Sequence, residues 1–423
     1  NRYFGNIKVD YKFHFLPELK AVVNMGYDEQ TSDGSIKVSD ENPLTQSDGR
    51  IVGSQSIYTA FQRNKLFDGY LNYKKELGKF NFGLTTGYSF QKFESGEYNS
   101  NELLDDGIDT EPITNVFSDL VLIGFFGRTN LTFWDKYLLT LSYRRDGASR
   151  FSSDTRWGNF PSAAVAWKVS EDLFPNSKTI STLKLRFGWG ITGQQDIGRT
   201  NTDLYLAKYV VGQPTSQYLF GSSVIPVGQP QFRNEIIKWE ETTTYNLGVD
   251  FGFMEDRFTG SIEVFSKESE DLLANAPISD GSNFSNAGFQ NVGSFTTQGL
   301  EFSLNGDVIR GEGAGFNWNL NYNTTLFKRE IKSLATGQSQ DVGDFSKGVT
   351  VQTNTVGYTP YSFYVYKQVY NEDGKPIEGG FADLNGDNII NADDKYIHHN
   401  GDPQITMGFL SNMSYRNFDL SFN

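Results

Sequence analysis

The sequence predicts an all-β protein whose antiparallel strands form a barrel that spans a membrane. Three observations support this prediction. Apolar and polar residues alternate over about ten residues in many segments, which is the period-two pattern of a strand with two unlike faces. The connections between these segments alternate between short and long. The longest nearly unbroken apolar stretch, residues 120–126, is far shorter than the roughly 18 to 20 residues that a membrane-spanning helix requires.

The alternation defines the individual strands. Residues 245–253 place tyrosine, leucine, valine and phenylalanine on one side, with asparagine, glycine and aspartate on the other. A four-residue turn at 254–257 leads into the same pattern at 258–264, and this arrangement predicts a hairpin. In residues 316–323 one face is aromatic and aliphatic while the other consists of asparagine alone. Residues 80–88 and 137–144 follow the same rule. Two strand faces that differ this strongly are expected in a barrel wall that has lipid on one side and a water-filled interior on the other.

The connections follow a regular order along the chain. Short connections are expected near 16–18, 77–78, 134–135, 254–257, 309–315 and 416–417, with a medium one at 170–181. Long connections are expected near 28–54, 93–115, 147–156, 193–238, 269–292 and 328–404. This order is typical of outer-membrane barrels, in which short turns face the periplasm and long loops face outward. An extracellular β-sandwich or a repeat array is the alternative, but neither has a reason to follow this rule.

The whole chain, residues 1–423, is therefore interpreted as one barrel segment of about 14 strands, the last of them cut off at Asn423. If the apolar face points to lipid, Arg144, Asn246, Asp250 and Glu263 line the interior together with the asparagines of 317–323. Large barrels enclose either an aqueous channel or a plug domain. Arg145 then lies on the outer face near the outer rim, where it would anchor the barrel to an anionic leaflet.

Composition excludes several classes of protein. The 423 residues contain 37 Lys and Arg against 51 Asp and Glu, which gives a net charge of −14. Cysteine is absent, which excludes a disulfide scaffold and cysteine-ligated zinc or iron–sulfur sites. The acidic balance, without a clustered basic face, argues against nucleic acid as a partner. The chain starts within a strand-like pattern, without a signal segment.

The sequence offers no constellation for covalent catalysis, so no enzymatic activity is expected. His14, His398 and His399 are the only histidines, and no serine elbow accompanies them. A barrel enzyme such as a lipase or protease therefore has no support from these residues.

One segment has the ligand spacing of a calcium loop. Residues 383–394 read DLNGDNIINADD, with oxygen ligands at the positions that an EF-hand-type loop uses for a hard cation. The side chains of Asp383, Asn385, Asp387 and Asp394 and the carbonyl of Ile389 would bind Ca²⁺. Position 388 is asparagine instead of glycine, and asparagine is tolerant of left-handed backbone. The alternative is an acidic turn held by its own side chain to backbone hydrogen bonds.

Aromatic residues in the long loops are the other candidate site. Flat rings could stack on sugar faces or on apolar peptide side chains, and together they suit a pocket for a polar organic ligand. The alternative is that they pack the loops against one another. The residues assigned to ligand binding are Tyr205, Tyr218, Phe232, Tyr361 and Tyr364.

Several patches in order resemble the SusC/RagA-type TonB-dependent outer-membrane transporters. The longest covers RRDGASRF at 144–151, WGNFPS at 157–162 and AWKVSE at 166–171. The others are LKLR at 183–186 with ITGQQ at 191–195, WE at 239–240 with TTYNLG at 243–248, NVG at 291–293 with GLE at 299–301, and DLNGD at 383–387. The resemblance covers roughly residues 115 to 420.

The resemblance implies a 22-stranded barrel with an N-terminal plug, of which this chain would be a middle and C-terminal part. It also implies a SusD-type surface lipoprotein over the long loops and the protein TonB, which would pull on an N-terminal box. Neither plug nor box lies in this sequence. Outer-membrane lipid and lipopolysaccharide would surround the barrel of a Gram-negative bacterium. The family imports oligosaccharides or peptides, so active import is the first functional hypothesis. A structural barrel that holds a larger surface assembly is the second.

Overall fold

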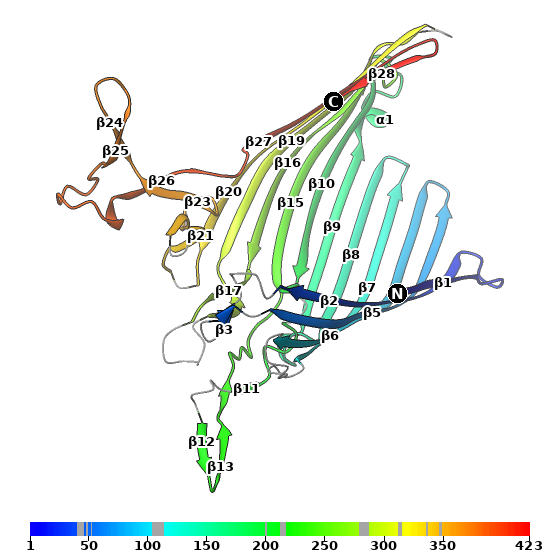
Figure 1. The fold of residues 1–423 in the computed structure, drawn as a ribbon. Coiled ribbons are helices and arrows are strands. Elements are labelled where there is room, and N and C mark those ends of the chain that lie inside the picture. Colours follow the sequence, from blue (N-terminus) through cyan, green and yellow to red (C-terminus); the bar gives the residue numbers. More distant parts are fainter. Residues whose placement is uncertain are drawn as a thin grey trace. The chain divides into compact units, whose positions relative to one another are not determined.

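The computed structural model describes residues 1–39, 46–47, 50–51, 53–103, 114–198, 201–211, 217–278, 287–311, 315–335, 337–346 and 349–423 (Figure 1). Its regular structure is almost entirely β, and the one described α-helix is α1 (Val169–Leu173), followed later by the 3₁₀ turn η1 (Ala392–Asp394). Within these ranges no helix is long and apolar enough to cross a membrane. The predicted all-β class is confirmed.

Fourteen strands form one antiparallel sheet, in which the hydrogen-bonded order is the order along the chain. The strands are β1 (Arg2–Lys12), β2 (Leu19–Val38), β5 (Ser54–Leu77), β6 (Phe80–Leu103), β7 (Thr114–Phe133), β8 (Tyr137–Ala148), β9 (Trp157–Lys168), β10 (Ile180–Gln194), β15 (Glu240–Phe253), β16 (Phe258–Glu270), β19 (Ser294–Ile309), β20 (Phe316–Ser333), β27 (Ile405–Tyr415) and β28 (Phe418–Phe422).

The remaining strands form small sheets within the long connections. The pairs are β3 (Gln46–Ser47) with β4 (Arg50–Ile51), β11 (Tyr209–Val211) with β14 (Gly228–Pro230), β12 (Gln217–Phe220) with β13 (Ser223–Pro226), β17 (Leu273–Pro277) with β18 (Ala287–Asn291), and β24 (Gln368–Tyr370) with β25 (Pro376–Phe381). A four-stranded sheet contains β21 (Gln340–Ser346), β22 (Val349–Asn354), β23 (Ser362–Tyr366) and β26 (Lys395–Asn400).

The chain divides into two compact units. Unit 1 consists of residues 1–163, 191–240 and 273–290, and unit 2 of residues 164–190, 241–272 and 291–423.

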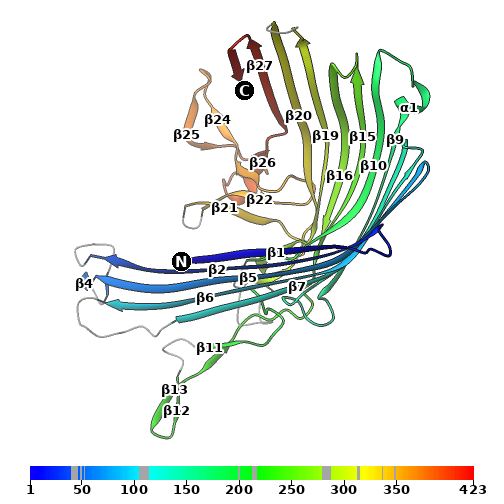
Figure 2. The same ribbon diagram turned by 90° about the vertical axis from the view of Figure 1, so that its right-hand side faces the viewer.

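In unit 1, strands β1, β2, β5, β6 and β7 lie side by side (Figure 2). Their register separates two faces, because directly opposite residues of antiparallel strands point to the same side of the sheet. One register row contains Asn24, Asp68, Ser89 and Gly124, and the next contains Met25, Phe67, Phe90 and Ile123. We call the first the inner face and the second the outer face. The alternation predicted from the sequence is therefore present in the sheet.

The predicted bounds of two long loops, 28–54 and 93–115, are wrong. Strand β2 continues to Val38, β6 continues to Leu103, and β7 already begins at Thr114. In these extensions charged residues occupy the outer face, for example Glu29 and Glu94, so the apolar alternation stops although the backbone ladder continues. The sequence pattern marks where the apolar face ends and does not mark where the strand ends.

A small core in unit 1 holds the long connections near the ends of the strands. Phe151 and Ile237 are fully buried, and the ring of Trp239 meets those of Phe151 and Phe160 edge to face at 5.7 and 5.4 Å. The indole Nε1–H of Trp239 also donates to the carbonyl of Arg156 at 2.8 Å. Residues far apart in the sequence are fixed to one another by these contacts.

In unit 2, the predicted hairpin at 245–264 is present. β15 pairs with β16 from Glu241 opposite Glu270 to Phe253 opposite Phe258, and the turn follows the expected residues. Met254, Glu255 and Asp256 in this turn have φ between 55° and 58°, in the left-handed region. Tyr245 and Leu247, on the apolar face, are at least half exposed. An apolar face that remains exposed in the isolated chain fits contact with lipid.

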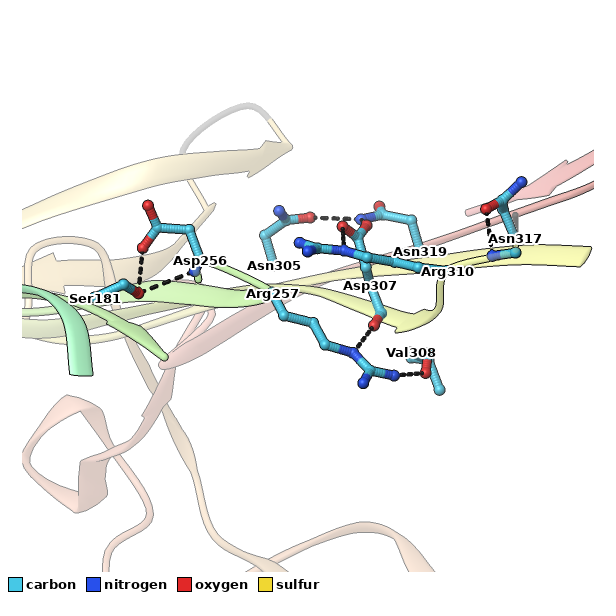
Figure 3. A network of polar contacts seen from close by, with 10 residues as sticks. Ser181, Asp256, Arg257, Asn305, Asp307, Val308, Arg310, Asn317 and Asn319 are labelled. Atoms are coloured by element: carbon cyan, nitrogen blue, oxygen red, sulfur yellow. Dashed lines mark hydrogen bonds and ion pairs between the residues drawn. The ribbon is translucent and has the colours of Figure 1, made fainter. Parts of the chain in front are cut away.

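Polar contacts fix the short turns of unit 2 (Figure 3). The hydroxyl of Ser181 donates to the Asp256 carboxylate at 2.6 Å, and the Arg257 guanidinium donates to the Asp307 carbonyl at 2.8 Å. The Asn319 amide donates to both Asn305 and Asp307, at 3.0 and 2.8 Å. The asparagine face of β20 therefore bonds laterally to its neighbour.

Candidate ligand and metal sites

The acidic loop 383–394 in unit 2 is closed by its own hydrogen bonds. The Asp383 carboxylate accepts from the backbone N–H groups of Gly386 and Asn388, at 2.6 and 2.8 Å. The Asp387 carboxylate accepts from the N–H of Ile389 at 2.7 Å. Asn388 has a φ of 63°, so asparagine adopts the left-handed geometry that glycine usually supplies here.

Asp394 is the anchor of this loop. Its side chain is fully buried, and its two oxygens accept from the N–H groups of Leu384 at 2.7 Å and Asn391 at 3.0 Å. These backbone donors, that of Asn391 first, hold the pKa of Asp394 below its ordinary value. Asn385 contributes its amide to Asp387 at 3.0 Å.

These contacts correspond to the self-bonded acidic turn, the alternative to a calcium loop. Among the residues that the structure describes, no group of three or more acidic, histidine or cysteine side chains is arranged to hold a metal ion. The donors are nevertheless hard oxygens, and each carboxylate oxygen has a second lone pair. Calcium binding by Asp383, Asn385, Asp387, Ile389 and Asp394 stays a prediction.

The three loop aromatics of unit 1 lie in different surroundings. The ring of Phe232 packs so closely on Gly288 that a Cβ there would lie 2.1 Å from it. The carbonyl of Tyr205 accepts from the Arg233 guanidinium at 3.0 Å. Tyr218 is 64% exposed on the β12–β13 hairpin, which projects away from the strands of unit 1 in both views (Figures 1 and 2). No contact joins these rings in the described part of the unit.

Of the two aromatics of unit 2, Tyr364 contacts the acidic loop. The hydroxyl of Tyr364 donates to the carbonyl of Ala392 at 3.4 Å, and the Lys395 ammonium lies 5.4 Å from the centre of its ring. Burial, and then the nearby carboxylates of Asp341 and Asp393, raise the pKa of Tyr364. Tyr361 is 57% exposed. The contacts of Tyr364 fit a packing role, and ligand binding by either residue stays a prediction.

The sequence did not indicate three adjoining cavities along the inner face of unit 1. Their volumes are about 260, 520 and 330 Å³, and neighbouring cavities share lining residues. Neutral amide and hydroxyl side chains make up about half of the polar lining, charged side chains make up the rest, and Phe93 and Leu122 supply apolar surface. The neutral polar residues are Asn6, Gln62, Asn64, Ser89, Gln91, Ser95, Ser118, Gln194 and Gln195.

The charged side chains along these cavities are paired with one another. The Arg2 guanidinium donates two hydrogen bonds to Asp28, at 2.9 and 3.1 Å, and Arg144 donates to Asp146 at 2.7 Å. A wall of amides and internally paired charges suits a neutral polar ligand, because such a wall offers hydrogen bonds without a net charge.

Arg150 is the buried cation of this site. Its side chain is 1% exposed, and its guanidinium donates to the carbonyls of Gln195 at 3.0 Å and Gly198 at 3.1 Å. The Asp196 carboxylate lies 3.5 Å away. Burial lowers the pKa of Arg150, and the charge of Asp196 opposes this effect. Arg150 therefore fixes residues 195–198, which form part of the cavity lining. The polar alternation of the strands could have indicated an inner wall, but the contribution of this loop depends on tertiary contacts.

The comparisons with known proteins agree with this geometry. The family model described as TonB dependent receptor-like, beta-barrel matches residues 1–420. TonB-dependent receptor SusC of Bacteroides thetaiotaomicron is 40% identical over all of this chain, which covers 43% of that protein. TonB-dependent receptor P3 of Formosa agariphila is 30% identical over 97% of this chain, again 43% of that protein.

Solved structures agree on the fold. The structure titled "Structure of the RagAB peptide transporter" superposes with a TM-score of 0.82 at 20% identity, covering 99% of this chain and 47% of that one. The chain therefore spans less than half the length of the relatives that it matches. At this identity the superposition shows a shared barrel fold and no more.

Proposed function

Because this chain belongs to the TonB-dependent receptor-like β-barrel family, we propose that the protein to which it contributes imports a nutrient actively across the outer membrane. The observation that carries this proposal is the two-faced sheet, apolar outside and lined inside by an amide-rich groove. Such a wall lets a polar ligand cross the membrane inside the barrel, where the polar side chains of the inner face replace its hydrogen bonds to water.

Family membership also settles two expectations. The chain is an outer-membrane protein of a Gram-negative bacterium, and the predicted barrel class and localisation are confirmed. The relatives are named as receptors or transporters, which agrees with the expectation that the chain is not an enzyme.

The cargo that we propose is an oligosaccharide or a peptide, and the neutral inner groove of unit 1 supports a polar cargo of either kind. We also propose that a SusD-type surface lipoprotein covers the outward loops and that TonB supplies the energy through an N-terminal region. No bond is made or broken in the cargo. Ligand would be captured from outside, held against the inner wall and released toward the periplasm.

The test is growth of a strain that lacks the gene on single nutrient sources. We expect growth to fail on one glycan or peptide source, and the full-length gene to restore it only when TonB is functional. A strain that grows normally on every source but loses a surface complex would favour the structural barrel instead.

Point variants connect this test to the groove. Gln62 and Gln91 line the cavities, and no hydrogen bond engages either side chain within the described residues. We expect a double variant with leucine at both positions to slow uptake. Leu141→Ile on the outer face is the matched control and should leave uptake unchanged.

A further inference from the structure

Two phenylalanine rings lie exposed on the inner face of unit 1, at the cavity of about 520 Å³. One register row crosses β1, β2, β5 and β6 through Phe4, Asp28, Asn64 and Phe93. This row belongs to the inner face because residues 24 and 28 of β2 point to the same side. Phe4 is 77% exposed and Phe93 is 39% exposed. Both rings lie on strands of the large sheet, whereas the aromatics assigned to ligand binding from the sequence lie outside it.

The space beside these rings is open because one residue of the wall has no side chain. Gly26 is the next inner position after Asp28 on β2, and it lines the cavity together with Asn6 and Leu66. A Cβ on Gly26 would lie 3.3 Å from the Cβ of Leu66 and 3.6 Å from the amide nitrogen of Asn6. A larger side chain at this position would therefore fill part of the cavity.

The two rings are too far apart to contact one small molecule. Strands β2 and β5 lie between β1 and β6. Neighbouring strands are separated by roughly 4.8 Å, so Phe4 and Phe93 start about 14 Å apart along the sheet. Only an extended ligand with several units can contact both rings at once.

The charged side chains of this cavity are all paired within the described residues. The Asp28 carboxylate accepts two hydrogen bonds from Arg2, at 2.9 and 3.1 Å, and the Arg2 guanidinium also lies 5.4 Å from the centre of the Phe4 ring. The Lys65 ammonium lies 2.9 Å from Glu94. The cavity therefore offers an anionic ligand no unpaired cation, while the Asp28 oxygens each keep a lone pair that can accept from a neutral donor.

The row lies on the outward side of the lipid. The chain neighbours of Asn64 and Phe93 point to the outer face, where a lipid-facing position would be apolar. All four of these neighbours are charged: Arg63, Lys65, Lys92 and Glu94. The apolar pair of Phe67 and Phe90 follows in the direction of the short turn. A ligand that enters from outside therefore meets Phe4 and Phe93 before it reaches the depth of the lipid.

The hydrogen-bonding groups at the cavity suit hydroxyl groups better than a peptide backbone. A peptide commonly binds a sheet by adding a strand to a free edge. Strands β2, β5 and β6 are paired on both sides, so their backbone groups are already engaged. What remains is a carboxylate and the side-chain amides of Asn6 and Gln91. A hydroxyl both donates and accepts, so it can pair with any of these groups.

We propose that this cavity binds a linear, uncharged oligosaccharide of several units. Phe4 and Phe93 stack on two separate sugar rings, and Asp28 with the neighbouring amides binds the hydroxyls between them. The face of an aromatic ring carries partial negative charge, which attracts the polarised C–H groups on one side of a sugar ring. The inference rests on the proposed import of a nutrient and narrows its cargo, because it disfavours peptides and acidic glycans.

The experiment measures binding to the full-length protein, purified in detergent, by isothermal titration. The probes are linear oligosaccharides of glucose, mannose, xylose or galactose with two and with six units, hexagalacturonic acid, and a set of neutral hexapeptides. We expect at least one neutral hexasaccharide to bind, and its disaccharide to bind at least tenfold more weakly because it cannot contact both rings. Hexagalacturonic acid should bind at least tenfold more weakly than the best neutral hexasaccharide.

Variants separate stacking from ordinary apolar contact. F4L/F93L keeps apolar side chains but removes the flat rings, so affinity for the hexasaccharide should fall at least tenfold. F4W/F93W retains flat faces and should stay within about threefold of the wild type. G26V should weaken binding because its side chain fills the cavity. The matched control F67L/F90L makes the same exchange at two directly opposite residues of the outer face and should leave affinity unchanged.

Two results would overturn the proposal. One is a wild-type protein that binds none of the neutral oligosaccharides, whether or not it binds the hexapeptides. The other is wild-type affinity in F4L/F93L, because the rings would then not stack on the sugar. Either result leaves the import proposal intact if the deletion strain still fails to grow on one nutrient source. Heat-modifiable migration on gels verifies that each variant has folded.

Discussion

Replacing Arg150 with alanine should release residues 195–198 in the full-length protein. The Arg150 guanidinium joins the loop after β8 to the carbonyls of Gln195 and Gly198, at 3.0 and 3.1 Å. Within the described residues, Asp196 is the one carboxylate paired with it, and because Asp196 is 74% exposed it adds little. The contact between the two loops therefore depends on the two hydrogen bonds that the almost fully buried Arg150 side chain donates to these carbonyls.

The magnitude follows from these two bonds. A hydrogen bond from a charged group contributes about 1.5–3 kcal/mol, and water entering the adjoining cavity would recover part of that for the exposed carbonyls. We expect a loss of about 3 kcal/mol in the free energy of local opening, which corresponds to a roughly hundredfold larger open population. The open population of Arg150→Lys should fall between those of the wild type and Arg150→Ala, because an ammonium group lacks the planar fork that reaches two carbonyls.

Hydrogen exchange measured by mass spectrometry is the assay. Peptides that cover residues 195–198 should exchange roughly a hundred times faster in Arg150→Ala, while peptides of the β15–β16 hairpin keep their wild-type rates. Arg233→Ala is the matched control: this exposed guanidinium donates to the Tyr205 carbonyl at 3.0 Å, and its loss should change exchange little. Unchanged protection of residues 195–198 in Arg150→Ala would refute the reasoning.

Three other predictions concern the lipid face, the acidic loop and a turn. Leu141→Arg places a charge on the exposed outer face and should lower folding stability in lipid vesicles by about 2–4 kcal/mol, whereas the inner-face control Gln91→Arg should change it little. If residues 383–394 bind Ca²⁺, millimolar calcium should protect them from proteolysis, and Asp394→Asn should abolish that protection; protection that is the same with and without calcium contradicts the site. The backbone N–H of Glu18 and then Lys75 hold the pKa of Glu18 below its ordinary value. This stabilisation is present above the unfolded pKa of about 4.3 and is lost as pH falls through the lowered folded value, so exchange of the 13–18 turn should rise in acid, and Glu18→Gln should remove that pH dependence.

The positions of the membrane-spanning strands could be predicted from the sequence because lipid imposes strict alternation. The β15–β16 hairpin begins and turns where the pattern predicts, and Arg145 lies on the expected face. Outside the lipid this constraint disappears. Charged residues such as Glu94 then occupy the outer face of a continuing strand, and the pattern no longer shows where the strand ends.

The candidate sites were harder to predict for a different reason. Loop aromatics such as Phe232 and Tyr364 have the right chemistry for stacking, but their contacts depend on how distant segments meet. The inner groove likewise requires Arg150 and Gln195, which are 45 residues apart in the sequence and are joined by a single hydrogen bond. Spacing predicts the donor atoms of the 383–394 loop, yet it does not determine whether those atoms bind a cation or the backbone.

The most direct test of the account is a spin-label scan along residues 245–250 of the full-length protein in lipid bilayers. The chain contains no cysteine, so each label can be attached to a single introduced cysteine, provided that none occurs in the rest of the protein. The account predicts that labels at 245, 247 and 249 collide with oxygen dissolved in the lipid, while those at 246, 248 and 250 do not. Equal accessibility at all six positions, or alternation with the opposite phase, would contradict the assignment of the two faces.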